Sequence, residues 1–205
     1  MRSNWLGRLV TRLSKRPKRS GRRRGRSVPT TNDPLPRHFD RVYLLRSVEL
    51  TLIAETEKRP GVETGGVLVG FVDARLNAVV VTAASGPGPR ATHGRYHFNR
   101  DARFCQRFLD ESASATRGVV DFVGEWHKHP EPDPHPSSQD RATYVALAGR
   151  GASDTPRPLV LIVGTWPTPR GHVYVGTNAF VFSADGFEQR KVEWRADDAY
   201  ADLRD

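Results

Sequence analysis

The sequence has almost no cysteine, since Cys105 is the single one among 205 residues. An intramolecular disulfide and a cysteine-based metal cluster are therefore excluded. The lack of disulfides fits a reducing compartment. Cys105 lies in a helix-like stretch between Phe104 and Phe108, which favours a buried thiol over a nucleophile.

Long apolar runs are also missing. No stretch approaches the ~20 residues that a membrane-spanning helix needs. The first residues lack the uninterrupted apolar stretch of a secretory signal, because Arg8 and Arg12 interrupt it. From these two absences and the single cysteine we expect a cytoplasmic protein.

The first 26 residues contain no Asp or Glu, although they hold 11 of the 32 Lys and Arg. The remainder has 21 basic against 23 acidic residues, so the net positive charge of the chain belongs to this segment. Residues 1–14 place apolar side chains on one face of a short helix, and residues 15–37, rich in Arg, Pro, Ser and Gly, predict a disordered linker. We interpret residues 1–38 as a basic tail and residues 39–205 as the folded domain.

Beyond the tail, strand and helix signals alternate along the chain. Strands are predicted at 42–45, 62–73, 78–84, 118–126, 159–166, 172–182 and 191–194, and helices at 48–58, 101–115 and 138–149. Ser47 and Asn99 are the candidate caps of the first two helices. The pattern indicates an α/β (α+β) fold in which a mixed sheet is flanked by helices.

The segment that follows the strand at 118–126 carries the most specific chemistry. His127 and His129 are two residues apart, so at the end of a strand both imidazoles point to the same side. Four prolines stiffen the loop that follows, and Asp140 lies where the next helix begins. Two His and one carboxylate leave the fourth position of a tetrahedral zinc ion open, which is typical of a catalytic site.

Two further residues complete the candidate site. Glu63 is the candidate general base, because the adjacent Gly65 and Gly66 allow a close approach of backbone and substrate. Glu55 and Glu57 are weaker candidates, since they lie in a helix-like stretch where solvated charges are expected. Ser137 is a candidate donor to an oxyanion, yet its Ser-x-x-Asp spacing to the candidate ligand is also typical of an ordinary helix N-terminus. The two interpretations are compatible.

These residues lie in motifs of a known family. GEWHKHP followed by PSSQD, with ETGGVLVG upstream, resembles the JAMM signature of JAB/MPN metallopeptidases, in particular their short prokaryotic branch. The resemblance covers about residues 40–195. It implies an MPN/JAB-like fold and one Zn²⁺ per chain, held by His127, His129 and Asp140, with Glu63 and Ser137 as catalytic residues.

The resemblance also implies a reaction and partners. The expected reaction is hydrolysis of an isopeptide or peptide bond after the C-terminal glycine of a ubiquitin-like protein or its conjugate. Activating and conjugating enzymes of that pathway are the expected partners. Two alternatives stay open, namely a non-catalytic MPN scaffold and an amidase acting on a small molecule or a sulfur carrier. The intact set of five residues argues against the scaffold.

One position departs from the family pattern. The residue between the paired His is usually Ser or Thr, and here it is Lys128. Strand alternation sends Lys128 away from the metal, so we expect it to be tolerated. A cation at this position is also a candidate influence on substrate choice. Trp126, next to the first His, is expected in the core, and His135 is expected to be solvated.

The basic tail has three interpretations, which the sequence does not separate. It binds nucleic acid or anionic lipid, docks a protein partner through its apolar helix face, or serves as a solubilising extension.

A truncation tests whether the tail is an independent electrostatic anchor. A protein that starts at Phe39 should hydrolyse a small peptide as fast as the full chain, but should lose binding to DNA or anionic vesicles. In the full chain that binding should weaken steeply with salt, because it rests on exposed charges. The anchor idea fails if truncation slows peptide hydrolysis severalfold while zinc content and Tm stay unchanged.

Overall fold

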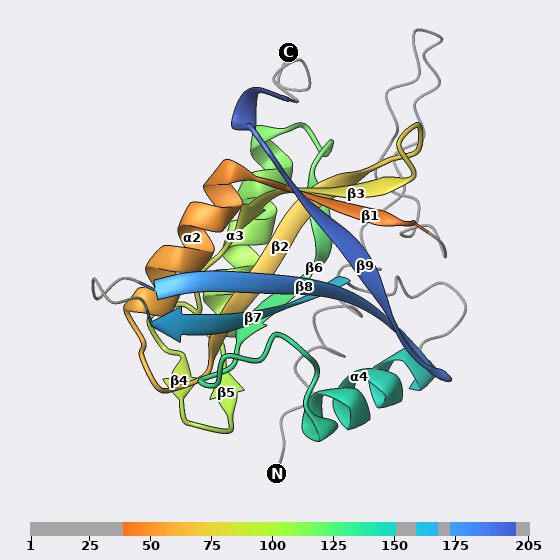
Figure 1. The fold of residues 1–205 in the computed structure, drawn as a ribbon. Coiled ribbons are helices and arrows are strands. Elements are labelled where there is room, and N and C mark those ends of the chain that lie inside the picture. The colour runs from red at the N-terminus through yellow and green to blue at the C-terminus, as the bar shows by residue number, and fades with distance from the viewer. Residues whose placement is uncertain (1–38, 151–158, 168–172, 200–205) are drawn as a thin grey trace, which may run out of the picture.

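The computed structural model describes residues 39–150, 159–167 and 173–199. It has one large sheet, three helices and a small two-stranded hairpin (Figure 1). In chain order the elements are β1 (Arg41–Leu45), α2 (Arg46–Glu57), β2 (Thr64–Asp73), β3 (Ala78–Ala84), β4 (Thr92–His93), β5 (Phe98–Asn99), α3 (Ala102–Ala115), β6 (Asp121–Lys128), α4 (Ser138–Arg150), β7 (Leu159–Pro167), β8 (Val173–Ser183) and β9 (Gly186–Arg195).

The large sheet is mixed and closes on itself. Its strand order is β1-β3-β2-β6-β7-β8-β9, and β1 pairs in parallel with both β3 and β9. β6 and β7 are also parallel, whereas the other neighbours are antiparallel. The predicted mixed sheet flanked by helices is confirmed. Its closure was not evident from the sequence, because β9 is much longer than the short strand predicted at 191–194.

The burial of β2 on both faces explains why residues 62–73 are an almost continuous apolar run. Its side chains alternate between two buried layers, as expected for a strand that is covered on both faces. Leu68 belongs to a core cluster with Leu52 of α2, whereas Val67 and Val69 belong to a second cluster with Leu109 of α3. The two helices therefore cover opposite faces of this strand, and Cys105 of α3 is buried as expected.

Both predicted helix caps are wrong. α2 begins at Arg46 directly after β1, so Ser47 lies inside the helix and its hydroxyl donates to Asp197 Oδ1 at 3.0 Å. Asp101, rather than Asn99, caps α3, because its carboxylate accepts from two backbone N–H groups in the first turn of the helix. Asn99 is instead part of β5.

The tail is outside the described part of the chain. The predicted helix at 1–14 and the predicted linker at 15–37 both fall on residues that the structure does not describe. Among the described residues, no helix combines the length and apolar character needed to cross a membrane.

A buried polar network fixes α4 against β6. Glu125 of β6 is fully buried, and its carboxylate accepts hydrogen bonds from the Tyr144 hydroxyl of α4 and from the Arg100 guanidinium, which follows β5. Burial, reinforced by the negative charge of Glu125, raises the pKa of Tyr144 well above its ordinary value. A buried carboxylate is tolerated only when such partners satisfy it. The network therefore ties α4, β6 and the hairpin together.

Removing one hydroxyl tests this network. Tyr144→Phe should lower the free energy of unfolding by about 1–3 kcal/mol, because the buried Glu125 then loses a donor. Tyr96→Phe is the matched control, since Tyr96 is 67% exposed, and it should stay within about 0.5 kcal/mol. Chemical denaturation of the three proteins measures both values. Equal stability of Tyr144→Phe and the wild type would contradict the account.

Candidate metal centre

The two histidines converge at the end of β6. This strand ends at Lys128, and the backbone of His129 continues the pairing by donating to Val163 O of β7 at 3.0 Å. His127 and His129 therefore point to the same side, and their Nε2 atoms lie 3.1 Å apart. Both side chains are buried. The prediction that one ion lies within reach of both imidazoles agrees with this geometry.

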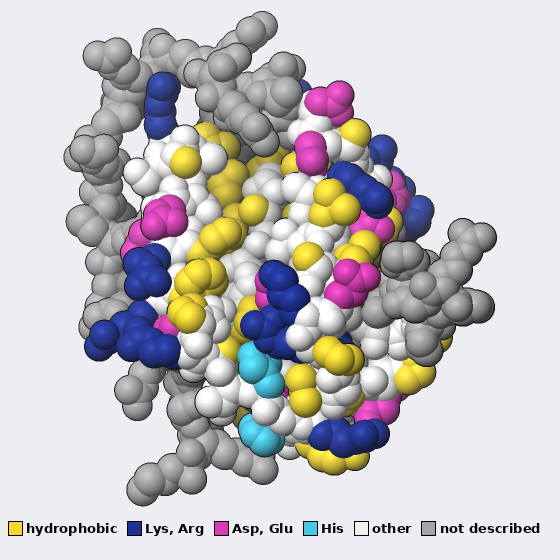
Figure 2. Space-filling model, turned by 90° about the vertical axis from the view of Figure 1, so that its left-hand side faces the viewer, with side chains coloured by type: hydrophobic (Ala, Val, Ile, Leu, Met, Phe, Trp, Pro, Cys, Tyr) yellow, Lys and Arg dark blue, Asp and Glu magenta, His cyan; other side chains and the backbone are white. Residues whose placement is uncertain are grey.

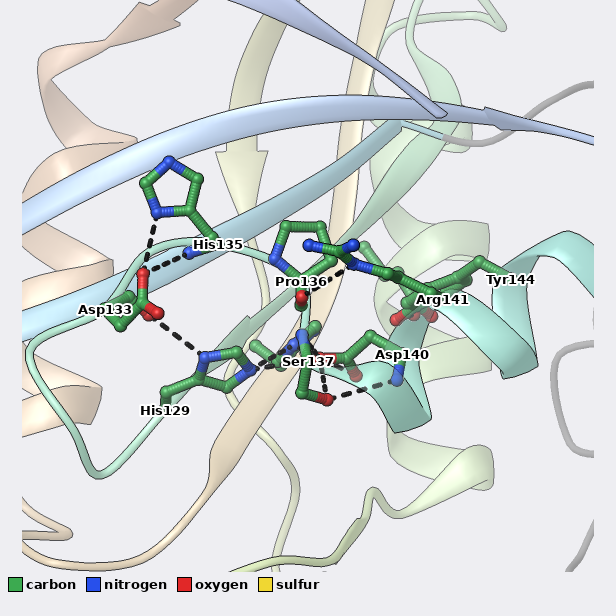
Figure 3. A network of polar contacts seen from close by, with 10 residues as sticks. His129, Asp133, His135, Pro136, Ser137, Asp140, Arg141 and Tyr144 are labelled. Carbon is green, nitrogen blue, oxygen red and sulfur yellow. Dashed lines mark hydrogen bonds and ion pairs between the residues drawn. The ribbon is translucent and has the colours of Figure 1, made fainter. Parts of the chain in front are cut away.

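The first turn of α4 brings the carboxylate to the imidazoles (Figure 3). Asp140 lies 3.2 Å from His129 Nε2 and 3.5 Å from His127 Nε2. Ser137, which immediately precedes α4, donates to Asp140 Oδ2 from its hydroxyl at 2.6 Å and from its backbone N–H at 2.9 Å. Its hydroxyl oxygen also accepts from the Asp140 N–H. The Ser-x-x-Asp segment is thus a helix N-terminus, and the same bonds orient the carboxylate toward the histidines.

The residues present fit a metal ion. His129 Nδ1 lies 3.0 Å from the carbonyl oxygen of Asp133. A carbonyl only accepts, so Nδ1 carries a proton, and when the ring loses its second proton the lone pair of Nε2 is left free to bind a metal ion. The ligand atoms of His127, His129 and Asp140 all lie within 4.8 Å of one another. Two imidazole nitrogens and one carboxylate form the donor set of many catalytic zinc sites.

The charges in the cluster favour an ionised carboxylate. Burial alone would raise the pKa of Asp140, but hydrogen bonds from His127 and His129 hold it far below its usual range. Burial opposes a charge on His129, yet the hydrogen bond and the negative charge of Asp140 outweigh it and raise the pKa of the imidazole. Asp140 is thus available as an anionic ligand.

Glu63 lies beside this cluster without belonging to its three ligands. It immediately precedes β2 and is partly buried. Its backbone N–H donates to Gly94 O at 2.8 Å, and its carbonyl accepts from His93 Nδ1 at 2.9 Å. Burial raises the pKa of the carboxyl, while His127 lowers it and Asp140 raises it. Because Thr64, the next residue, pairs with Lys128 between the two histidines, Glu63 lies beside the strand end that carries them, where a general base is expected.

The other residues considered for the site are either exposed or engaged in other interactions. Glu55 forms ion pairs at the end of α2, and Glu57 is exposed. His135 is exposed and pairs with Asp133, as expected for a solvated loop residue. Trp126 is fully buried in the core, which confirms its expected role.

The glycine pair after Glu63 is needed for backbone packing. A Cβ at Gly65 would lie 2.2 Å from Trp126 O and 3.0 Å from the Phe98 ring, and one at Gly66 would lie 2.1 Å from Ser85 O. The expected close approach of backbones is therefore confirmed. Protein atoms fill these positions, so neither glycine opens space for a substrate at its Cβ position.

Lys128 lies on the other side of β6 from the histidines, as strand alternation predicts. It is only 1% exposed, and its Nζ donates to Arg59 O at 2.5 Å. Burial lowers the pKa of its ammonium. A buried ammonium does not reach a substrate, so any influence of Lys128 on substrate choice has to be indirect, and that influence stays a prediction.

Three residues around the site were not among the sequence-based candidates: Glu125, Arg100 and His93. Glu125 had a usable signal, since it is a charged residue inside an apolar strand, two positions before His127. Arg100 and His93 had no such signal in the sequence, because their contacts join segments that are distant in sequence.

Figure 2 shows the surface of the molecule on the side that carries α2. On this surface Lys and Arg side chains lie beside His side chains.

Comparisons with known proteins identify the family to which this chain belongs. Residues 45–180 match the family described as prokaryotic homologs of the JAB domain. The chain is 33% identical to a CD-NTase/cGAS isopeptidase of Escherichia coli (strain TW11681), over 50% of this chain and 62% of that protein. It is 31% identical to a CD-NTase/cGAS isopeptidase of Enterobacter hormaechei, over 57% and 63%. The chain thus spans less than two thirds of the length of these curated relatives.

Two more distant similarities extend the comparison. A protein of Sinorhizobium fredii named "Probable metalloprotease y4qB" is 26% identical over 66% of this chain and 83% of its own length. The solution structure of protein DSY2949 from Desulfitobacterium hafniense has a TM-score of 0.56 at 18% identity, covering 76% of this chain and 93% of that one. The latter shows the fold alone. On the family match, which covers most of the chain and includes all five candidate site residues, this protein belongs to the prokaryotic JAB family.

Proposed function

We propose that this protein is a zinc-dependent isopeptidase or peptidase that cleaves after the C-terminal glycine of a ubiquitin-like modifier. The observation that supports hydrolysis best is the convergence of His127, His129 and Asp140, whose ligand atoms lie within 4.8 Å of one another. The relatives named isopeptidase and metalloprotease support the same reaction class. Because several relatives are named CD-NTase/cGAS isopeptidases, a conjugate of such an enzyme is the target that we propose.

In this proposal the three ligands hold one zinc ion per chain. When bound, the zinc acts as a Lewis acid that polarises the scissile carbonyl and acidifies a water molecule. The protein contributes the orientation of its ligands. Asp133 O fixes the tautomer of His129, and the two bonds from Ser137 fix the carboxylate of Asp140.

Glu63 is the proposed general base. It accepts the proton of the attacking water and passes it to the leaving amine. Its partial burial and raised pKa suit this role, because a carboxyl with a raised pKa holds the proton between the two steps. Both backbone polar groups of Glu63 are hydrogen-bonded to the β4–β5 hairpin, which restricts the position of the carboxyl group.

Ser137 is the proposed donor to the oxyanion of the substrate. Its hydroxyl donates to Asp140 Oδ2, so this role requires the hydroxyl to turn toward the substrate carbonyl. The backbone N–H of Ser137 donates to the same Asp140 oxygen at 2.9 Å. The carboxylate therefore keeps one of its orienting bonds when the hydroxyl turns away.

The metal is tested first. The purified protein should contain close to one zinc ion per chain, and His129→Ala should lose most of it, because the two remaining ligands hold zinc poorly. His135→Ala is the control, since His135 is an exposed histidine of the adjacent loop, and it should keep its zinc. Elemental analysis measures all three. Full zinc occupancy of His129→Ala would remove this residue from the ligand set.

The chemistry is tested separately from metal binding. Glu63→Gln should keep zinc and fold but lose hydrolysis by a factor of about 10² or more, as expected when a general base is removed. The assay follows cleavage of a ubiquitin-like modifier joined through its C-terminal glycine to a lysine. Glu57→Gln is the matched control, because Glu57 is exposed, and it should keep wild-type activity. A Glu63→Gln variant as active as the wild type would exclude Glu63 as the base.

A further inference from the structure

A buried cation lies directly behind the candidate metal ligands. Lys128 is opposite Thr64 in the pairing of β6 with β2, so it lies next to the segment that carries Glu63. Burying an ammonium group is costly unless hydrogen bonds compensate it. Nζ donates to the carbonyl oxygen of Arg59, which lies in the connection between α2 and β2. Lys128 therefore holds the start of that connection against β6.

The side chain of Arg59 continues this set of bonds. Its Nη1 lies 2.7 Å from Glu55 Oε2, and its Nε donates to His93 Nε2 at 3.1 Å. Since Nε2 accepts this bond, the proton of the neutral imidazole resides on Nδ1. Nδ1 then donates to the carbonyl oxygen of Glu63 at 2.9 Å. All donors and acceptors from Lys128 to Glu63 are thus consistent with one tautomer of His93.

The hairpin holds the other backbone group of Glu63 as well. The N–H of Glu63 donates to Gly94 O at 2.8 Å. Both the N–H and the carbonyl of Glu63 are therefore hydrogen-bonded to adjacent residues of the hairpin. His93 in turn accepts from the side chain of Arg59, whose carbonyl accepts from Lys128 of β6. Lys128 does not point at the cluster, because His127 and His129 occupy the other side of β6.

We propose that Lys128, Arg59 and His93 form a bridge that positions Glu63 relative to the metal ligands on β6. This inference rests on the proposed role of Glu63 as general base. Proton transfer requires the base within about 2.6–3.2 Å of its proton donor, and a displacement of about 1 Å costs up to ~100-fold in rate. Lys128 and His93 are accordingly positioning residues, which act through Glu63.

The kinetic test compares Lys128→Met in two backgrounds. Methionine keeps an unbranched, apolar stem but removes the ammonium. In the otherwise wild-type protein, kcat should fall about tenfold, with KM and zinc content unchanged. In the Glu63→Gln background the same substitution should cause no further loss, because the residue that the bridge positions is already inactive. Lys191→Met is the control, since Lys191 is an exposed lysine, and it should leave kcat unchanged.

A second readout does not depend on activity. Hydrogen exchange should become faster at the Glu63 amide in Lys128→Met, whereas amides of β7 should keep their protection. If the wild-type protein hydrolyses no modifier conjugate, the proposed function fails, and this exchange measurement still tests the bridge.

The inference is overturned if Lys128→Met matches the wild type in kcat and exchange. It is also overturned if kcat falls by the same factor in both backgrounds, or if zinc is lost, since either result indicates a general structural role. Should Lys128→Met fail to fold, His93→Phe tests the other end of the bridge. Phenylalanine retains a ring for the stacking on Phe98, whose centroid lies 5.3 Å away, but removes both hydrogen bonds. The same kinetic and exchange results are expected, and wild-type values would overturn the proposal.

Discussion

The candidate site depends on the contact between the first turn of α4 and the end of β6. The positions of the two histidines follow from strand geometry alone, but the third candidate ligand, Asp140, comes from a different element, α4. The hydrogen bonds between Ser137 and Asp140 cap the first turn of α4, and they also orient the Asp140 carboxylate toward the histidines. One turn further along, Tyr144 hydrogen-bonds Glu125 and stacks on the His127 ring, with centroids 6.3 Å apart. A helix that is docked in this way presents its ligand in a fixed direction.

Several polar groups around the site are buried, and each of them lowers stability unless it is paired. Glu125 and Lys128 lie on opposite sides of the strand that ends in the histidines. Glu125 supports the helix that carries Asp140, whereas Lys128 supports the connection that carries Glu63. In proteins generally, well-packed apolar residues in place of buried charges are often at least as stabilising. These buried charges support the elements that carry Asp140 and Glu63, which agrees with the proposed positioning of the candidate ligands and the candidate base.

The sequence predicted the strands and helices well, because the apolar periodicity and the turn residues are local signals. The convergence of the three candidate ligands was also predictable, since His127 and His129 lie on one strand face and Asp140 follows at the start of the next helix. The Asn99 cap failed locally, because Asp101 two residues later caps α3, whereas other failures came from interactions between distant segments. Ser47 bonds to Asp197, 150 residues away, so a cap read from local sequence was wrong. Likewise, the bond from Lys128 to Arg59 depends on β2 and β6 lying side by side, which no local pattern specifies.

The central claim is that His127, His129 and Asp140 hold zinc. X-ray absorption spectroscopy at the zinc edge tests it most directly, because this method reports the atoms bound to the ion. The account predicts only nitrogen and oxygen neighbours, at about 2.0–2.2 Å, with the multiple-scattering pattern of two imidazoles. A sulfur neighbour at about 2.3 Å, or a spectrum with fewer than two imidazoles, would contradict it.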